Sequence, residues 1–325
     1  MLTLFFRKPS ENFHSIENLF FSLKKYIEKE IPLKTIFLPY HKGIKRILNL
    51  PYVWLHRDKI NHITGDVNYI ALALPKKNTI LTIHDIGSIL NSNQNKIKKV
   101  IIKFLWLKLP LKRVKKITVI SEFSKNEVLK YFKIPQEKIK IIPNCVSDDF
   151  KYTPLPINKK PIILHIGTKV NKNLEGLILA AKDINCKLLI IGKLNDKQKQ
   201  LLEKNKLDYI NRVNISTEEM IKAYQQSDIL FFASFYEGFG LPILEAQAIG
   251  RPIITSNISP MKEVAADGAL LINPYSVQEI KNAIIELITN KTLVNSLIDK
   301  GLKNVQKYKA KNIAQEYIQL YREFL

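Results

Sequence analysis

This chain has little cysteine and no long apolar run, and each shortage excludes a class of protein. Its 325 residues include two cysteines, Cys145 and Cys186, too few for a disulfide framework and without a metal-binding spacing. No apolar stretch approaches the ~18 residues that a membrane-spanning helix needs. The N-terminal run Leu2–Phe6 is too short for a signal peptide. The sequence therefore predicts a globular, cytoplasmic protein.

Acidic residues are also scarce, because 51 Lys+Arg face 29 Asp+Glu, a formal net charge of +22. The first 150 residues carry 27 basic and 12 acidic residues, whereas the remainder carries 24 and 17. Only seven of the basic residues are arginine, which is typical of AT-rich codon usage. Codon usage acts evenly along a chain, however, so the asymmetry favours a surface that meets anions, either nucleic acid or a membrane face.

Twelve short apolar runs alternate with helical stretches, which predicts repeated β-α units and parallel sheets covered by helices on both faces. The fold class is therefore α/β, with two Rossmann-like doubly wound domains facing a cleft and a helical C-terminal tail. Prolines at 154, 156 and 161 lie among polar residues, so we place the domains at 1–150 and 151–308, and a helix at 309–325 that packs back on the first domain. The expected strands are Leu2–Phe6, Lys34–Leu38, Ile60–Ile63, Thr79–Ile83, Lys116–Ile120, Ile139–Ile142, Ile162–Ile166, Lys187–Ile191, Tyr209–Val213, Ile229–Phe232, Pro252–Thr255 and Ala269–Ile272.

The segment from Glu237 to Glu245 is the most informative, because two carboxylates eight positions apart enclose two glycines and a proline. It follows the apolar run Ile229–Phe232 and predicts a strand, a turn and a helix that begins at Pro242. Backbone N–H groups and the positive end of a helix dipole suit an anion there. Two acids beside an anion site make sense if the ligand also carries hydroxyls, as a nucleotide sugar does. The backbone groups expected to bind are those of Gly238, Phe239, Gly240 and Leu241.

Other candidate residues follow the ends of expected strands, where ligands bind in parallel sheets. His84 and Asp85 end a strand of the first half, and histidine is the usual general acid or base. For this pair considered alone, however, a capping Asp beside a structural His is the better explanation. Ser121 is expected mainly to cap a helix. Gly167 and Lys172 follow the first strand of the second half, where the lysine could hold phosphate charge as a point cation.

Together these segments resemble the family 4 retaining glycosyltransferases with the GT-B fold, over roughly residues 82–274. Five segments carry the resemblance: Glu237–Glu245 is similar to the family's E-x7-E motif, Thr82–Asp85 to its T-x-H-D segment, Ser121–Lys125 to its S-E-x-S/T segment, Pro143–Asn144 to its P-N-G-V hinge, and Gly167 with Lys172 and Asn173 to its donor-phosphate loop. The chain departs from the family at Cys145, where glycine is usual, and at 9–15, where many members have a Gly-Gly turn. Acceptor recognition near the first strand is therefore the least defined part, and 61–66 could form part of an acceptor wall.

The resemblance implies a hexosyltransferase that moves a sugar from a nucleotide diphosphate sugar to a glycan or lipid-linked acceptor, as in polysaccharide or lipopolysaccharide biosynthesis. Transfer would retain the anomeric configuration and need neither metal nor cofactor, the nucleotide sugar being a co-substrate. Lys172 and the helix N-terminus would stabilise the leaving diphosphate. Glu237 would bind donor-sugar hydroxyls and Glu245 the ribose. His84 is the second catalytic candidate, and Asp85, Ser121 and Asn144 are candidates for the acceptor side or the cleft.

Residues 91–116 hold nine basic residues and no acid, with apolar residues at helical spacing. A core-packed helix with a solvated basic face explains the apolar stripe, whereas contact with anionic lipid also explains the charge. We expect peripheral contact with the inner face of the membrane through 96–116. A nucleic-acid-binding protein is a rival, but no module signature or interleaved aromatic surface supports it, so we expect no nucleic-acid partner. A nucleotide-sugar epimerase or hydrolase of the same fold stays an alternative.

Overall fold

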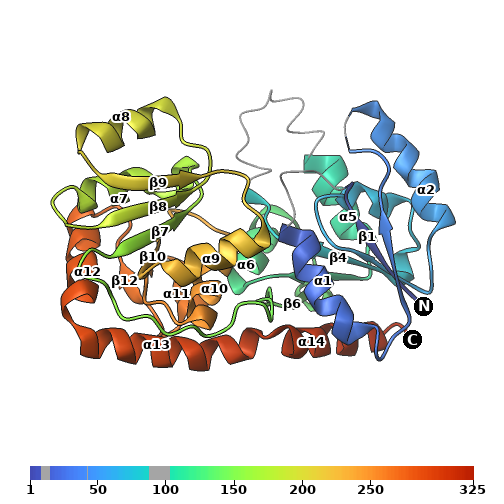
Figure 1. Ribbon diagram of the computed structural model, residues 1–325. Coiled ribbons are helices and arrows are strands. Elements are labelled where there is room, and N and C mark those ends of the chain that lie inside the picture. The colour runs from blue at the N-terminus through green and yellow to red at the C-terminus, as the bar shows by residue number, and fades with distance from the viewer. Residues whose placement is uncertain (9–14, 42, 88–102) are drawn as a thin grey trace. The chain divides into compact units, whose positions relative to one another are not determined.

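The computed structural model describes residues 1–8, 15–41, 43–87 and 103–325 (Figure 1). The chain divides into two compact units, Met1–Cys145 with Ala310–Leu325, and Val146–Lys309. Each unit contains one six-stranded sheet in which every pair of neighbouring strands is parallel. The expected fold class, two doubly wound α/β domains with a helical C-terminal region, is confirmed. Within the described residues, no helix has the length and hydropathy that a membrane crossing needs.

The sheet of the first unit has the strand order β2-β1-β3-β4-β5-β6. Its strands are β1 (Leu2–Phe6), β2 (Leu33–Phe37), β3 (Ile60–Ile63), β4 (Thr79–Ile83), β5 (Lys116–Val119) and β6 (Ile139–Ile141). Its helices are α1 (Ser15–Ile27), α2 (Asn49–Leu55), α5 (Leu109–Arg113), α6 (Glu122–Tyr131) and α14 (Ala310–Arg322). Because the order reverses between β1 and β3, the carboxyl ends of these two strands form a topological switch point, where ligands of such sheets bind.

The C-terminal helix α14 packs against α1 and closes one face of the first sheet. Its residues Tyr317 and Tyr321 are buried in the same hydrophobic cluster as Phe20 of α1. The hydroxyl of Tyr321 lies 2.7 Å from Nδ1 of His62, a fully buried residue of β3. The last sixteen residues of the chain are thus part of the core of the first unit.

The sheet of the second unit has the order β12-β11-β10-β7-β8-β9. Its strands are β7 (Ile162–Ile166), β8 (Lys187–Ile191), β9 (Asp208–Arg212), β10 (Ile229–Phe232), β11 (Ile253–Ser256) and β12 (Leu270–Ile272). Its helices are α7 (Leu174–Ala181), α8 (Asp196–Lys204), α9 (Thr217–Gln226), α10 (Leu241–Ile249), α11 (Met261–Ala265), α12 (Val277–Thr289) and α13 (Lys291–Val305). This is the order of the dinucleotide-binding Rossmann fold, and its switch point lies between β7 and β10.

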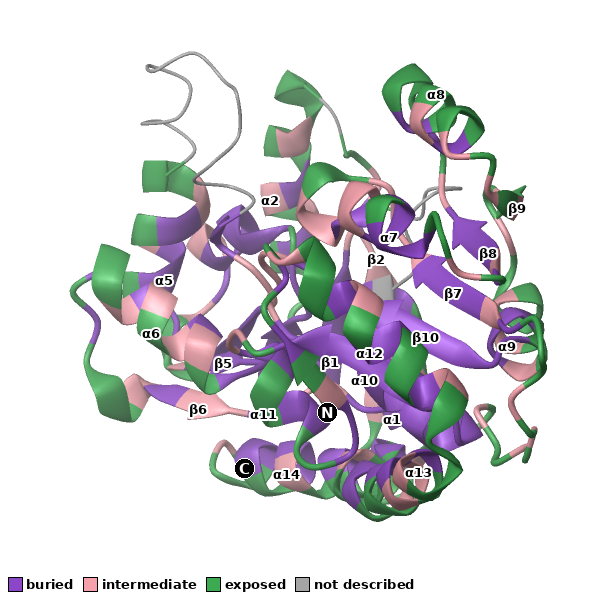
Figure 2. Cartoon of the chain, turned by 90° about the vertical axis from the view of Figure 1, so that its left-hand side faces the viewer, coloured by how far each residue is buried: buried purple, intermediate pink, exposed green. Residues whose placement is uncertain are grey.

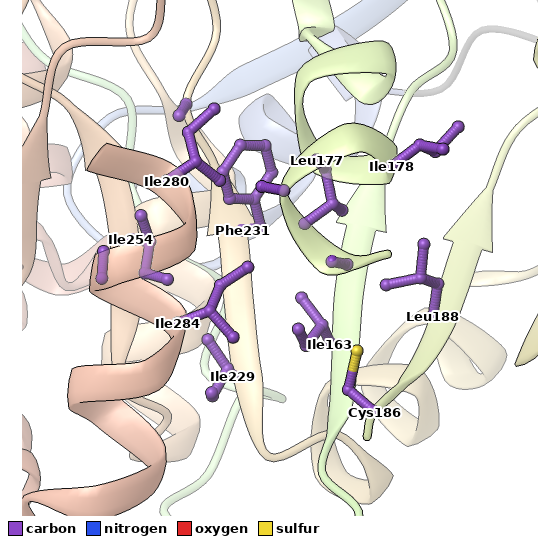
Figure 3. Packing of buried hydrophobic residues seen from close by; sticks show 14 of the residues in the cluster. Ile163, Leu177, Ile178, Cys186, Leu188, Ile229, Phe231, Ile254, Ile280 and Ile284 are labelled. Atoms are coloured by element: carbon purple, nitrogen blue, oxygen red, sulfur yellow. The ribbon is translucent and has the colours of Figure 1, made fainter. Parts of the chain in front are cut away.

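The core of the second unit lies between its sheet and the helices α7 and α12. Figure 3 shows Leu177 of α7 and Ile280 and Ile284 of α12 over strand residues that include Ile163 and Phe231. The central strands β7, β8 and β10 are mostly buried, whereas the edge strand β9 is mostly exposed (Figure 2). Burial on both faces explains why the central strands are continuous apolar runs in the sequence.

All twelve expected strands are present, with ends that move by at most one residue, but some helices differ from expectation. Helix α10 begins at Leu241 rather than Pro242, because Gly240 is the N-cap at φ +116°. Helix α8 was not expected, since its sequence is polar, yet the side chain of Asn195 and that of Gln198 form a capping box at its start. In the basic segment 91–116, where the apolar residues have helical spacing, residues 91–102 lie outside the described residues, and Lys103–Lys108 form a π-helical turn.

Candidate functional site

At the switch point of the second sheet, a lysine and a glutamate that lie 65 residues apart in the sequence form an ion pair. Lys172 ends a short 3-10 turn, η6 (Val170–Lys172), after β7, and Glu237 lies in the loop between β10 and α10. Lys172 Nζ donates to Glu237 Oε1 at 2.6 Å, and the two side chains are 21% and 15% exposed. Lys172 Nζ also lies 4.9 Å from the centroid of the Phe232 ring. The structure thus brings together the two residues that the sequence suggested for phosphate and sugar.

Gly167 allows the aliphatic stem of Lys172 to approach the backbone after β7. The glycine has φ +93°, and a Cβ atom there would lie 2.9 Å from Cγ of Lys172. Its N–H donates to Ile191 O at 2.8 Å, which fixes the turn to the neighbouring strand β8. Only glycine allows both this backbone angle and this close approach of the lysine stem. Gly167 therefore contributes to the site by positioning Lys172.

Two asparagines hold the turn that carries Lys172 against the loop that carries Glu237. The backbone N–H of Phe235 donates to Asn171 O at 2.8 Å, and Asn171 Nδ2 donates to Tyr236 O at 3.0 Å. The buried Asn173, at φ +61°, donates through Nδ2 to Ala233 O. The ion pair is therefore set by the backbone of both loops as well as by its own charge.

The helix α10 begins directly after this ion pair, with Gly240 as its N-cap and Leu241 as its first residue. The Phe239 side chain is buried and its ring packs edge-on to that of Tyr308, with centroids 6.0 Å apart. Phe239 could therefore contribute to an anion site through its backbone N–H and not through its ring.

Glu245, on the second turn of α10, accepts a hydrogen bond from the hydroxyl of Tyr224 on α9 at 2.5 Å. Burial raises the pKa of Glu245 to about 7, against the opposite effect of this hydrogen bond. The carboxyl group is thus already oriented by the protein. The sequence alone gave no sign of Tyr224, because it lies 21 residues away on another helix.

His165 is a buried residue of β7 that sequence reasoning did not select. It lies directly before the Gly167 turn, and neither of its ring nitrogens has a hydrogen-bond partner among the described residues. Burial lowers the pKa of His165 to about 4, so the ring is neutral at pH 7. Its ring stacks at a tilt on Phe231, with centroids 5.9 Å apart. The backbone groups of Gly167 and Phe231 oppose the effect of burial on the pKa of His165, so the ring is not in a purely apolar environment.

In the first unit, His84 lies at the carboxyl end of β4 and is oriented by the loop after β3. Its Nε2 is 2.7 Å from Thr64 O, and since a carbonyl only accepts, the ring carries its proton on Nε2. Burial lowers the pKa of His84, which leaves Nδ1 as an acceptor on a neutral ring. Gly65 has φ +136°, and a Cβ atom there would lie 2.6 Å from Cδ2 of the imidazole. Gly65 thus makes room for the histidine.

An ionic network at the switch point of the first sheet was missed by sequence reasoning. Arg7, directly after β1, donates from Nε and Nη2 to the two carboxylate oxygens of the buried Glu17, at 2.8 and 3.0 Å. Its Nη1 donates to Asp66, after β3. Of the segment 61–66, expected to form part of an acceptor wall, Asn61 and His62 are buried, whereas Asp66 is exposed at the strand ends.

The remaining candidates of the first unit lie at strand ends without forming one cluster. Asp85 accepts from the N–H of Gly87 at 2.7 Å, and Ser121 caps α6 by accepting from the N–H of Ser124 at 3.0 Å, as expected. Asn144 precedes Cys145, where the chain leaves the first unit. Cys145 keeps a negative φ, so this position needs no glycine. Across the described residues, no three His, Cys, Asp or Glu side chains gather to hold a metal ion.

Two family models match the chain in consecutive segments. Residues 32–150 match the model described as Glycosyltransferase Family 4, and residues 148–304 match Glycosyl transferases group 1. The second match contains the Lys172–Glu237 pair and the Glu245–Tyr224 contact, and the first contains His84, Asp85 and Ser121.

Similar proteins include bacterial mannosyltransferases. The chain is 27% identical to the O-antigen chain mannosyltransferase B of Escherichia coli over 293 residues, which cover 83% of this chain and 76% of the relative. It is 29% identical to the O-antigen chain mannosyltransferase RfbU of Salmonella typhimurium over 219 residues, covering 64% of this chain and 60% of the relative. The Anabaena protein Alr3699/HepE, solved with UDP and glucose, has the same fold, with a TM-score of 0.80 at 15% identity over 99% of this chain and all of that one.

Proposed function

Because the chain belongs to the family 4 glycosyltransferases with the GT-B fold, we propose that it transfers a hexosyl group from a nucleotide diphosphate sugar to a polysaccharide or lipid-linked glycan, with retention of the anomeric configuration. The observation that carries this proposal is the ion pair between Lys172 and Glu237 at the switch point of the second sheet. Mannose is the first sugar to test, since the similar enzymes named above are mannosyltransferases.

The ion pair suits a sugar joined to a phosphate. In such a donor the ring hydroxyls and the phosphate oxygens lie a few bonds apart, so an acid and a base in contact can each meet one of them. Lys172 would turn to the phosphate and Glu237 would accept from the sugar hydroxyls. Glu245, already oriented by Tyr224, would accept from the ribose.

The charges at this site support the proposal of retaining transfer without a metal ion or a resident cofactor. As the glycosidic bond breaks, negative charge grows on the leaving diphosphate, and positive charge grows on the sugar ring. The Lys172 ammonium and the N-terminus of α10 would stabilise the first, while the Glu237 carboxylate would stabilise the second. The leaving phosphate itself would take the proton of the acceptor hydroxyl, so that the new bond forms on the face that the diphosphate leaves.

The acceptor is proposed to bind at the switch point of the first sheet. Nδ1 of His84 is an acceptor on a neutral ring, and Asp66 is partly exposed beside it in the Arg7 network. Hydrogen-bond acceptors of this kind suit the hydroxyls of a glycan. Asp85, Ser121 and Asn144 stay candidates for this side of the reaction.

Replacement of Glu237 by glutamine tests the proposal, because it keeps the size of the side chain and removes its charge. Sugar transfer should fall by about 10²–10³-fold, with a smaller change in donor affinity. A panel of nucleotide sugars is first screened by thermal stabilisation of the wild-type protein, and transfer is then followed with and without acceptor glycans. Full transfer by the glutamine variant would remove Glu237 from catalysis, and donor hydrolysis without transfer would favour a hydrolase.

Peripheral contact with an anionic membrane through 96–116 is part of the same proposal. Of this segment, residues 103–116 are described, and Phe104 and Leu105 are exposed beside Lys103 and Lys108. Apolar side chains between exposed lysines are typical of helices that lie on anionic lipid. Flotation with phosphatidylglycerol vesicles at physiological salt tests this. A protein that stays in the unbound fraction would contradict the contact.

A further inference from the structure

A cavity of about 800 Å³ lies at the amino edge of the first sheet. Three segments line it, and each of them leads into a strand: 76–77 precede β4, 112–116 lead into β5, and 133–138 precede β6. Because the strands are parallel, their amino ends share one edge, opposite the carboxyl edge where the Arg7 network and His84 lie. The cavity is therefore separate from the residues of the first unit described above.

Seven of the eleven residues that line the cavity are lysines, and Glu137 is the only acid. The lining residues are Lys76, Lys77, Lys112, Val114, Lys115, Lys116, Lys133, Ile134, Pro135, Glu137 and Lys138. Within the described part of the chain, no carboxylate forms an ion pair with Lys76, Lys77, Lys112 or Lys133. Lys116 Nζ lies 3.8 Å from Glu323 Oε2. Most of the positive charge around this cavity thus has no counterion among the described residues.

The positive charge is also held in place by the fold. Lys138 Nζ donates to the carbonyls of Leu111 and Lys112, at 2.7 and 2.8 Å, at the C-terminal end of α5. Burial, and then the charge of Lys76, lower the pKa of Lys138 to about 8. A positive group kept close to others of the same sign costs free energy unless an anion joins them. The geometry and the repulsion therefore favour a bound anion.

The apolar part of the lining defines the ligand further. Pro135 is exposed next to the ammonium groups, whereas Ile134 is mostly buried and Val114 fully buried beneath the lining. Lysine binds a phosphate as a point charge, and the several lysines of this lining together suit a group that carries more than one negative charge, as a phosphate does. A small inorganic anion would use the charge but not the apolar wall. A phosphate joined to an organic body would use both.

We propose that this cavity binds a phosphate ester, with its phosphate among Lys76, Lys77, Lys112 and Lys133 and its organic part against Pro135 and the accessible edge of Ile134. The ester is either a small soluble molecule or the headgroup of an anionic phospholipid. The two sources share the same chemistry, and they differ in whether a bilayer must present the phosphate. This inference does not rest on the proposed transfer reaction.

The test compares two triple variants of the full chain that change the net charge equally. K76Q/K77Q/K133Q removes three cavity lysines that lie outside the 96–116 segment. K197Q/K204Q/K303Q removes three exposed lysines of the second unit that form no ion pair with any described residue. Binding of glycerol 3-phosphate is measured by calorimetry. Binding to phosphatidylcholine vesicles with and without phosphatidic acid is measured by flotation.

The wild-type protein is expected to bind one of the two probes, with affinity lowered at least about 10-fold in the cavity variant and unchanged in the control. Binding of glycerol 3-phosphate in solution identifies a small soluble ester, whereas binding to phosphatidic acid vesicles alone identifies a lipid headgroup. The proposal is overturned if the wild type binds neither probe, or if both triple variants lose binding equally. Nucleotide-sugar stabilisation of the second unit should be the same in all three proteins, which separates this outcome from a failure of the transfer proposal.

Discussion

At the carboxyl edge of the second sheet one lysine meets a carboxylate at 2.6 Å, whereas at the amino edge of the first sheet four lysines meet none among the described residues. Lys172 is positioned by Gly167, Asn171 and Asn173, so its charge is directed at one point. The lysines of the cavity come from three separate segments and surround a volume. A single lysine fixed by its neighbours can thus act on one atom of a ligand, whereas several lysines around a volume attract an anion through their summed charge.

Of the substitutions that test this comparison, replacing Lys172 by methionine should have the largest effect, which is a loss of affinity for a nucleoside diphosphate. Methionine keeps an unbranched apolar stem against Gly167 and Phe232, but it removes the charge and leaves Glu237 without its cation. We expect the affinity for a nucleoside diphosphate to fall by about 10²-fold, equivalent to about 2.7 kcal/mol. Lys303→Met is the matched control, since Lys303 is exposed, forms no ion pair with any described residue and lies outside both proposed sites. Calorimetry that finds equal affinity in the two variants would contradict the role of Lys172.

The two buried histidines of the sheets differ in their hydrogen-bond partners, so replacing each of them should change the free energy of unfolding by a different amount. His62 contacts the hydroxyls of Tyr321 and Thr82, both at 2.7 Å, whereas His165 has no partner among the described residues. His62→Leu leaves the Tyr321 hydroxyl buried without this partner, so it should lower the free energy of unfolding by about 2 kcal/mol. His165→Leu should change it by less than about 0.5 kcal/mol, because no hydrogen bond is lost. Urea denaturation measures both, and an equal loss would show that His165 has a polar role.

Gly167→Ala tests whether the backbone positions Lys172. The alanine must adopt φ +93° and place its Cβ 2.9 Å from Lys172 Cγ, so the lysine stem has to move. Donor affinity should fall about 10-fold, close to 1.4 kcal/mol. Gly43→Ala is the control. Gly43 also has a positive φ, +62°, but a Cβ there meets nothing within 4 Å, so this substitution introduces backbone strain without a steric contact. Calorimetry in which both variants keep wild-type affinity would show that Gly167 is needed only for its turn.

Much of this fold could be predicted from the sequence, because strands buried on both faces must be apolar runs. Ile162–Ile166, Lys187–Ile191 and Ile229–Phe232 are strands as expected. Helix α8 was missed because so few of its residues are apolar, although the Asn195–Gln198 capping box marks its start. Elements can thus be located from the sequence where a buried face requires a run of apolar residues or where capping residues mark the start of a helix.

The partners of the site residues could not be predicted in the same way. The sequence suggested Lys172 and Glu237 separately, and their contact depends on β7 and β10 being neighbours, which is a property of strand order. The Arg7–Glu17 pair joins a strand end to a helix across residues that carry no motif. The cavity lysines belong to three segments, each of which is typical of a solvated surface when considered alone.

The smallest expected effect concerns Glu245, whose charge is affected by burial rather than by a paired cation. Its pKa is raised from 4.5 to about 7. Between pH 4.5 and pH 7, the carboxyl group is therefore protonated in the folded state and ionised in the unfolded state. The wild-type free energy of unfolding should therefore fall as pH rises through this window, by about 1 kcal/mol between pH 6 and pH 7. Glu245→Gln does not titrate, so the difference in stability between the variant and the wild type should grow in favour of the variant over this interval. Urea denaturation at the two pH values measures the difference. A constant difference would mean that the Glu245 carboxyl is already charged at pH 6, and that the Tyr224 hydroxyl stabilises the charge more than burial opposes it.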